Sequence, residues 1–414
     1  MTDMAGAVPV IAVDKVQAVA LAVCTYYFGV WLKGKVGVLS RYSIPSPVVG
    51  GMSFAIVVSF LEYFNIVKVQ IDSTLQTVLM LGFFTTIGLM ASLRVVKDGG
   101  RLLLGFLLAV TVLVFLQNGM GMAIAEAMGF DKHYGILAGS VSMMGGLGTA
   151  AAFGPYFEET YGITGGTAVA VTAATFGMVA ALLIGGPFGE WCIRRYKVKT
   201  PDEVQHPEPE LHLPDDMDTD ITEQHASAKP NFTNEIMRAV SVTALAMGLG
   251  TIVSNFLGHY ITLPAYIGAM IVATVIRNVG DFSGMYKVEG KGLNAVADIT
   301  LVLFVTMAIN NLKLHELVHL ALPLVVILAC QTILMLIYAW TVLFTAFGRS
   351  YDAVMLSVGG IGFSMGATAN GLANMQAISE KYGSSPRAWL IVSVVGAFLI
   401  DLINAVVITW FGTL

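Results

Sequence analysis

Two glycine-rich stretches, one in each half of the chain, carry the backbone groups best suited to bind a small anion. The first, SMMGGLGTAAAF, runs from Ser142 to Phe153, and the second, GGIGFSMGATAN, runs from Gly359 to Asn370. Glycine allows a tight turn with uncovered N–H groups, and a helix that begins there adds the positive end of its dipole. We therefore predict that each stretch contains an anion-binding turn that suits a carboxylate.

The residues predicted to bind substrate lie at these turns or opposite them. They are Gly145, Gly146, Gly148, Thr149 and Thr175 in the first half, and Gly366, Ala367, Thr368, Asn370 and Asn374 in the second. The alternative is that the small residues only let helices pack closely, as small-xxx-small faces do in membranes. Two copies at matching positions of the two halves favour a binding site over simple packing.

Asp401 is the plainest ionisable residue inside an apolar segment, AFLIDLINA. A carboxylate in the middle of a membrane span costs roughly 2.5–3.5 kcal/mol on insertion scales, and no predicted span has a Lys or Arg away from its ends as a partner. A bound sodium ion or proton is the expected partner, and Asn404 follows on the same helix face. Ser364 and Gln376 complete the predicted set of sodium ligands. The alternative is a structural aspartate that is protonated or internally hydrogen-bonded.

Other polar residues of the apolar segments have simpler interpretations. Gln117, Asn118 and Gln331 occupy related places in the two halves, and we expect them to form hydrogen bonds between helices. The run GFSMG, which ends at Gly366, matches the Gly-x-Ser-x-Gly elbow of serine hydrolases. That elbow needs a preceding strand and a histidine base, whereas the 7 histidines lie in predicted loops, the linker or span edges. The three cysteines lack metal-type spacing. The sequence therefore disfavours an enzyme and predicts no bound cofactor.

The composition and the lengths of the apolar runs predict the helices and turns that position these residues. The chain has 414 residues, of which 56% are hydrophobic and only 12% charged, so it is expected to be an all-α membrane protein embedded in a lipid bilayer, with no nucleic-acid partner. Spans of about 20 apolar residues are predicted near 16–33, 46–64, 75–93, 102–124, 165–187, 236–257, 262–277, 296–312, 317–346 and 388–412. The glycine stretches, too broken to span, are predicted to be re-entrant hairpins near 136–158 and 353–380.

Two repeats are predicted, an N-terminal one over 1–193 and a C-terminal one over 235–414, joined by a polar linker over 194–234. Ile44-Pro45 aligns with Leu263-Pro264 across the halves. Five crossings in each repeat place the second in inverted orientation. Cytoplasmic loops collect Lys and Arg, and this rule places both termini in the periplasm and the linker in the cytoplasm.

Several motifs, in order along the chain, together resemble a known family. They are YSIPSPVVGG at 42–51, GGLGTAAA at 145–152, GFSMGAT at 362–368, ANMQAI at 373–378 and VGAFLID at 395–401. This pattern, which covers about Tyr42 to Val407, is similar to that of the bacterial sodium/glutamate symporters.

The resemblance implies sodium-coupled import of L-glutamate across the bacterial inner membrane by alternating access. Amides around Gly145 to Thr149 and Gly366 to Thr368 would meet near the membrane centre and hold the carboxylates, with Na⁺ as the co-transported ion. A homodimer and an elevator-type motion are further expectations. Leu147 and Ala369 depart from the family pattern, so another dicarboxylate or amino acid stays an alternative substrate. A channel and an intramembrane hydrolase are the alternatives from other classes.

Overall fold

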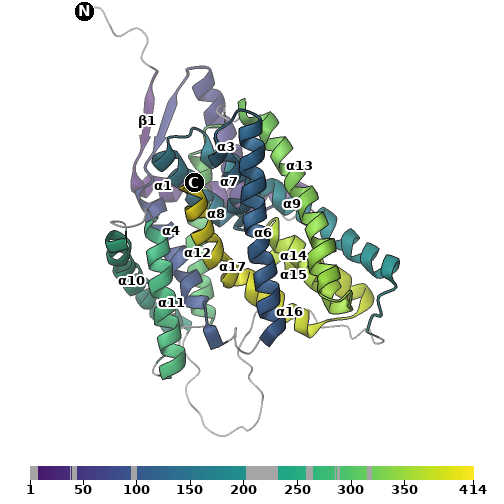
Figure 1. Cartoon of the computed structure of the whole chain (residues 1–414). Coiled ribbons are helices and arrows are strands. Elements are labelled where there is room, and N and C mark those ends of the chain that lie inside the picture. The colour runs from purple at the N-terminus through teal and green to yellow at the C-terminus, as the bar shows by residue number, and fades with distance from the viewer. Residues whose placement is uncertain are drawn as a thin grey trace, which may run out of the picture.

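The computed structural model is dominated by helices that run roughly alongside one another (Figure 1). It describes residues 8–37, 39, 44–94, 100–201, 232–257, 264–284, 286, 290–314 and 319–414. Most of the predicted linker and the beginning of the YSIPSPVVGG motif lie outside these residues.

A helix occupies each of the predicted spans. These helices are α1 (Lys15–Lys35), α3 (Ser46–Tyr63), α4 (Thr74–Met90), α6 (Gly100–Ala127), α9 (Gly166–Tyr196), α10 (Phe232–Leu257), α11 (Ala265–Ser283), α12 (Lys291–Asn310), α13 (Ala321–Tyr338) with its continuation η3 (Ala339–Ala346), and the run of α16 (Pro386–Val394), η4 (Val395–Leu399) and α17 (Ile400–Gly412). Helix α9 continues to Tyr196 and therefore takes the first residues of the predicted linker.

Length and apolarity identify this chain as a multi-pass membrane protein. Among the described residues, 8 helices are long and apolar enough to cross a membrane, while α4 is apolar but shorter and α11 is not among the 8. Large apolar side chains also lie on the outer faces of the helices, such as Leu108, Leu245 and Leu322, which are 66–69% exposed. A surface of this kind suits lipid rather than water. The inverted relation of the halves stays a prediction.

One small β-ladder adds to the predicted all-α fold. Strand β1 (Val10–Val13) pairs in parallel with β2 (Lys68–Ile71), just before α1 and just after α3. Next to it, the Asp14 carboxylate accepts hydrogen bonds from the N–H groups of Val16 and Gln17, and the Gln17 side chain accepts one from the Asp14 N–H. This capping box satisfies backbone donors that would otherwise be unpaired and fixes where α1 begins.

The helices form two groups, which can be followed in Figure 1. The α1 group contains α1, α3, α4, α10, α11 and α12, and the α6 group contains α6, α9, α13, α16, α17 and the two glycine stretches. Within the α1 group, glycines bring backbones together: a Cβ on Gly50 would lie 1.8 Å from the Thr25 carbonyl oxygen. The groups meet mainly where the first glycine stretch packs on α12 and where η4 approaches α4.

Polar side chains of α11 hold the end of α4. The Asp281 carboxylate accepts hydrogen bonds from Ser92 Oγ at 2.6 Å and from Arg277 Nε at 3.0 Å. The Asn278 amide donates to the Ala91 carbonyl and accepts from the Leu93 N–H, each at 2.8 Å. These bonds satisfy backbone groups that the helix end leaves without intrahelical partners.

Both glycine stretches fold as a helix, a turn and a second helix. The first consists of α7 (Lys132–Ile136), the π-helical turn η1 (Leu137–Val141) and α8 (Gly146–Tyr161), and the second of α14 (Tyr351–Ser364) and α15 (Thr368–Tyr382). Their limits enclose the predicted hairpins near 136–158 and 353–380. Because no membrane boundary is part of this geometry, re-entry stays a prediction.

Candidate functional site

The turns of the two glycine stretches touch each other. Gly146 has a φ of +62°, and a Cβ on it would lie 2.5 Å from the Gly366 carbonyl oxygen. A Cβ on Gly177 of α9 would lie 2.1 Å from the Met365 carbonyl oxygen and 3.1 Å from the Met143 methyl carbon. Only glycine permits such approaches. The folded chain thus brings together two turns that are far apart in sequence, with α9 beside them.

Two helices begin at this junction with uncapped N-termini. Helix α8 begins at Gly146 and α15 begins at Thr368, and neither receives a side-chain hydrogen bond at its N-cap. The first turn of any helix has N–H groups without intrahelical partners, and the dipole makes that end positive. Two such ends close together form an environment that favours a negatively charged ligand.

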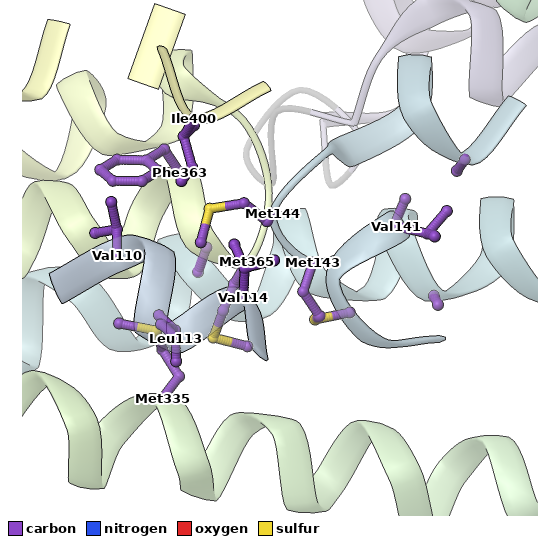
Figure 2. Packing of buried hydrophobic residues seen from close by; sticks show 14 of the residues in the cluster. Val110, Leu113, Val114, Val141, Met143, Met144, Met335, Phe363, Met365 and Ile400 are labelled. Carbon is purple, nitrogen blue, oxygen red and sulfur yellow. The ribbon is translucent and has the colours of Figure 1, made fainter. Parts of the chain in front are cut away.

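Methionine side chains fill the space around the turns. Met143, Met144 and Met365 are at most 3% exposed, and Figure 2 shows them in the same packed region as Phe363 and Ile400. Methionine is flexible and adapts its shape to its neighbours. The junction is therefore closed by side chains that can rearrange at low cost.

The predicted polar residues of α15 hold that helix against its neighbours. Asn370 Nδ2 donates to the Met178 carbonyl and Asn374 Nδ2 to the Ala181 carbonyl, both at 3.0 Å and both on α9. Thr368 Oγ1 donates to the Gly396 carbonyl in η4 at 2.5 Å. The beginning of α15 is thus tied to two other helices of the α6 group.

The remaining predicted substrate residues differ in what they contact. The Thr149 side chain folds back over Gly145, where a Cβ would lie 2.4 Å from it. Gly148 packs toward the α1 group, since a Cβ there would lie 3.0 Å from the Phe83 ring. Thr175 is half-buried on α9, and its hydroxyl donates within that helix to Val171. Gly145, Gly146, Gly366 and Ala367 form the turns themselves. The junction thus collects most of the predicted set, with Thr175 contributing least.

Asp401 lies near the beginning of α17, half-buried, and has no hydrogen-bond or ion-pair partner among the residues that the structure describes. The other predicted sodium ligands are not gathered around it. Asn404 Nδ2 donates to the Ser140 carbonyl at 3.1 Å, whereas Ser364 ends α14 beside Gln117. Gln376 donates to Glu380 on the outer side of α15.

Helix α6 touches both glycine stretches through two consecutive residues. Gln117 Nε2 donates to the Ser364 carbonyl at 2.9 Å, and Asn118 Oδ1 accepts from the Ser140 N–H at 2.9 Å. Gln331 Nε2 of α13 donates to the Gln117 carbonyl at 2.7 Å. The expected hydrogen bonds between helices are thereby confirmed for the two glutamines. Ser140 was not singled out by sequence reasoning, because a serine in an apolar run is common and only its kinked surroundings at Gly139 distinguish it.

Neither metal-cluster nor hydrolase chemistry gains support from the geometry. No group of three or more His, Cys, Asp or Glu side chains that could hold a metal is found in the described part of the chain. Ser364 of the GFSMG run ends a helix instead of following a strand, so the strand and elbow of a hydrolase do not exist at this place.

Comparisons with known proteins agree with the sequence motifs. A family profile described as Sodium/glutamate symporter matches residues 11–384. A sodium/glutamate symporter of Escherichia coli (strain K12) is 37% identical over 397 residues, which cover 95% of this chain and 96% of that protein. A protein of the same name from Haemophilus influenzae is 34% identical over 395 residues, covering 94% of this chain and 95% of its own.

Proposed function

The chain belongs to the sodium/glutamate symporter family, and from that premise we propose that it imports L-glutamate together with Na⁺ across the bacterial inner membrane. It is a transporter and not an enzyme. The two uncapped helix N-termini at the contact between Gly146 and Gly366 carry this proposal. Glutamate has two carboxylates, and two positive helix ends at one place offer each of them a set of backbone N–H groups.

The substrate site is proposed to lie between the turns. Amides near Gly145, Gly146, Gly148 and Thr149 would bind one carboxylate, and those near Gly366, Ala367 and Thr368 the other. The Gly145 and Gly146 N–H groups donate to the Ser140 and Ser142 carbonyls, so these two would exchange partners as the carboxylate binds. Asn370, Asn374 and Thr175 would line the pocket from α15 and α9. The tight packing at this junction requires the methionine side chains to move as glutamate binds. Discrimination between glutamate and another dicarboxylate or amino acid would depend on the separation of the two helix ends.

Sodium is proposed to bind close to Asp401, with Asn404 three residues along the same helix as the nearest other predicted ligand. Ser364 and Gln376, which the sequence also predicts as ligands, are held elsewhere by their contacts with Gln117 and Glu380. A carboxylate without a protein partner in an apolar helix favours a bound cation. One positive charge that moves inward gains about 2.3 kcal/mol per 100 mV, which corresponds to roughly fifty-fold accumulation. Because glutamate carries a net charge of −1, a complex with one Na⁺ is neutral and is driven by the sodium concentration gradient alone, and the membrane potential contributes when a further Na⁺ is coupled.

The two helix groups suggest how access alternates. The α6 group contains both glycine stretches, and its contacts with the α1 group are confined to a few places. We propose an elevator-type motion of the α6 group against the α1 group, with inverted repeats whose re-entrant hairpins open in turn. The α1 group would then form the fixed interface of a homodimer. Both termini are proposed to lie in the periplasm and the 194–234 linker in the cytoplasm.

Uptake of radiolabelled glutamate into proteoliposomes tests the function. We expect an inward sodium gradient to drive accumulation and a choline gradient to give only background. Asp401→Asn is expected to raise the sodium concentration needed for half-maximal uptake about tenfold, since it removes a charged ligand. Glutamate uptake that is indifferent to sodium would refute symport, whereas unsaturable flux would indicate a channel.

A further inference from the structure

Two buried glutamine side chains donate to backbone carbonyls of neighbouring helices beside the second glycine stretch. Gln331 of α13 donates to the carbonyl of Gln117 on α6, and the Gln117 side chain donates to the carbonyl of Ser364, the last residue of α14. Gln117 and Gln331 are 1% exposed and Ser364 is 0% exposed. These hydrogen bonds therefore connect three helices in a region that water does not reach from the surface.

The hydrogen bonds leave only oxygen atoms without partners. Each glutamine uses its Nε2 as a donor, which fixes the amide orientation and leaves Oε1 as its free end. Gln117 Oε1, Gln331 Oε1 and Ser364 Oγ are buried and have no hydrogen-bond partner among the described residues. An acceptor buried without a partner is destabilising. Two amide oxygens, together with a hydroxyl that can donate as well as accept, therefore favour a ligand that is positively charged or hydrogen-donating.

A neighbouring polar cluster differs in composition and serves as a contrast. Around Ser140, the unpartnered atoms are Ser140 Oγ, Asn404 Oδ1 and Asn118 Nδ2. The Asn118 nitrogen is a donor, because its Oδ1 already accepts from the Ser140 N–H. A mixture of donor and acceptors suits a buried water molecule. The oxygen-only set at Gln117, Gln331 and Ser364 instead suits a hard cation, which binds carbonyl, amide and hydroxyl oxygens.

The end of helix α14 also favours a cation at this place electrostatically. The helix ends at Ser364, so its last carbonyl groups and the negative end of its dipole lie at the two glutamines. Ends of discontinuous membrane helices coordinate Na⁺ in other transporters. The surroundings are apolar: Figure 2 shows Leu113, Val114, Met335 and Met365, which lie within about a turn of the three polar residues, packed in one region. Few mobile dipoles are available there to screen a cation from its ligands.

We propose that Gln117, Gln331 and Ser364 form a binding site for Na⁺, in addition to the one proposed at Asp401. This inference rests on the proposed symport function and deepens it, since it makes two glutamines of the apolar helices ligands of the transported ion. It also places a cation on the α14 end of the second turn, while the glutamate carboxylate is bound at the α15 end.

The test uses the full-length protein in lipid nanodiscs without glutamate. The apparent melting temperature is measured as NaCl replaces choline chloride at constant ionic strength, because an ion that binds the folded state stabilises it. Ser364→Ala removes one proposed ligand. Ser357→Ala is the matched control, since Ser357 lies on the same helix, is equally buried, and donates its hydroxyl to the Ala353 carbonyl. Gln331→Leu is a second ligand variant.

We expect Ser364→Ala and Gln331→Leu to raise the sodium concentration for half-maximal stabilisation about 10- to 100-fold, and Ser357→Ala to leave it unchanged. Because Ser364→Ala deletes a single oxygen, it keeps the test valid if Gln331→Leu does not fold. If both ligand variants need the same sodium concentration for half-maximal stabilisation as the wild type, the site is overturned and a bound water is indicated. If potassium stabilises the wild type as much as sodium does, the assignment of the site to Na⁺ is overturned. If wild-type uptake is sodium-driven in the same study, such results refute this site alone and leave the proposed function intact.

Discussion

Gly146→Ala is the substitution that tests the junction of the two turns most directly. At a φ of +62° an alanine costs about 1–2 kcal/mol of backbone strain. In addition, its Cβ would lie 2.5 Å from the Gly366 carbonyl oxygen, whereas ordinary contact begins at 3.4 Å. The two turns must therefore separate by about 1 Å, and the helix ends at α8 and α15 move apart with them.

Such a displacement weakens the hydrogen bonds to one of the two carboxylates. Loss of one charge-assisted hydrogen bond costs about 1.5–3 kcal/mol, so we expect the KM for glutamate uptake to rise roughly 10- to 100-fold. The control is Gly162→Ala at the end of α8, where φ is +68° and no atom lies within 4 Å of the added Cβ. It carries the same backbone strain without the clash.

Proteoliposome uptake at a fixed sodium gradient, together with thermal unfolding, separates these effects. Both variants are expected to lose thermal stability through backbone strain, Gly146→Ala more because of its added clash, whereas only Gly146→Ala should lose affinity for glutamate. If Gly146→Ala and Gly162→Ala show the same KM as the wild type, the substrate does not bind between the turns, and the argument from the paired helix ends is wrong.

Two further substitutions test the packing that supports the site. Asn370→Ala removes the donor to the Met178 carbonyl and is expected to cost about 1–3 kcal/mol of stability, whereas Gln376→Ala, on the exposed side of the same helix, should cost less than about 0.5 kcal/mol; apparent melting temperatures compare the two. Gly29→Leu on α1 would place its Cβ 2.2 Å from a backbone oxygen of α3, so we expect overpacking to cost about 1–3 kcal/mol of stability or more. Gly34→Leu on the same helix meets nothing within 4 Å, and an equal loss of stability there would contradict this account.

The membrane-spanning helices could be predicted from the sequence because each span is a long apolar run with a clear beginning and end. Pro45 stands directly before α3 and Pro264 directly before α11. The small β-ladder was not predicted, because four-residue strands such as Val10–Val13 have no periodicity that separates them from a loop. The contact of β1 with β2 depends on the folded positions of α1 and α3.

The candidate site could be predicted only in part. Glycine-rich turns are visible in the sequence, which therefore predicts the residues around Gly146 and Gly366 but not the contact between them. Partners of polar side chains depend on packing between distant segments and are not visible. Gln376 and Asn404 illustrate this point: the first bonds to Glu380 four residues along, and the second to Ser140 of the other half.

The adjacency of Gln117 and Asn118 on α6 limits how the two glycine stretches can move relative to each other. Successive residues of a helix are fixed only 1.5 Å apart along its axis, yet these two hold the last residue of α14 and the kink before α8. Neither stretch can slide along α6 without breaking a buried bond, so Ser364 and Ser140 keep a constant spacing, and a hairpin that opens must do so beyond these two contacts. Glutamate and Na⁺ would then move together with the α6 group. Their transport would be coupled by the shared geometry of their sites and not by a conformational change transmitted between separate sites.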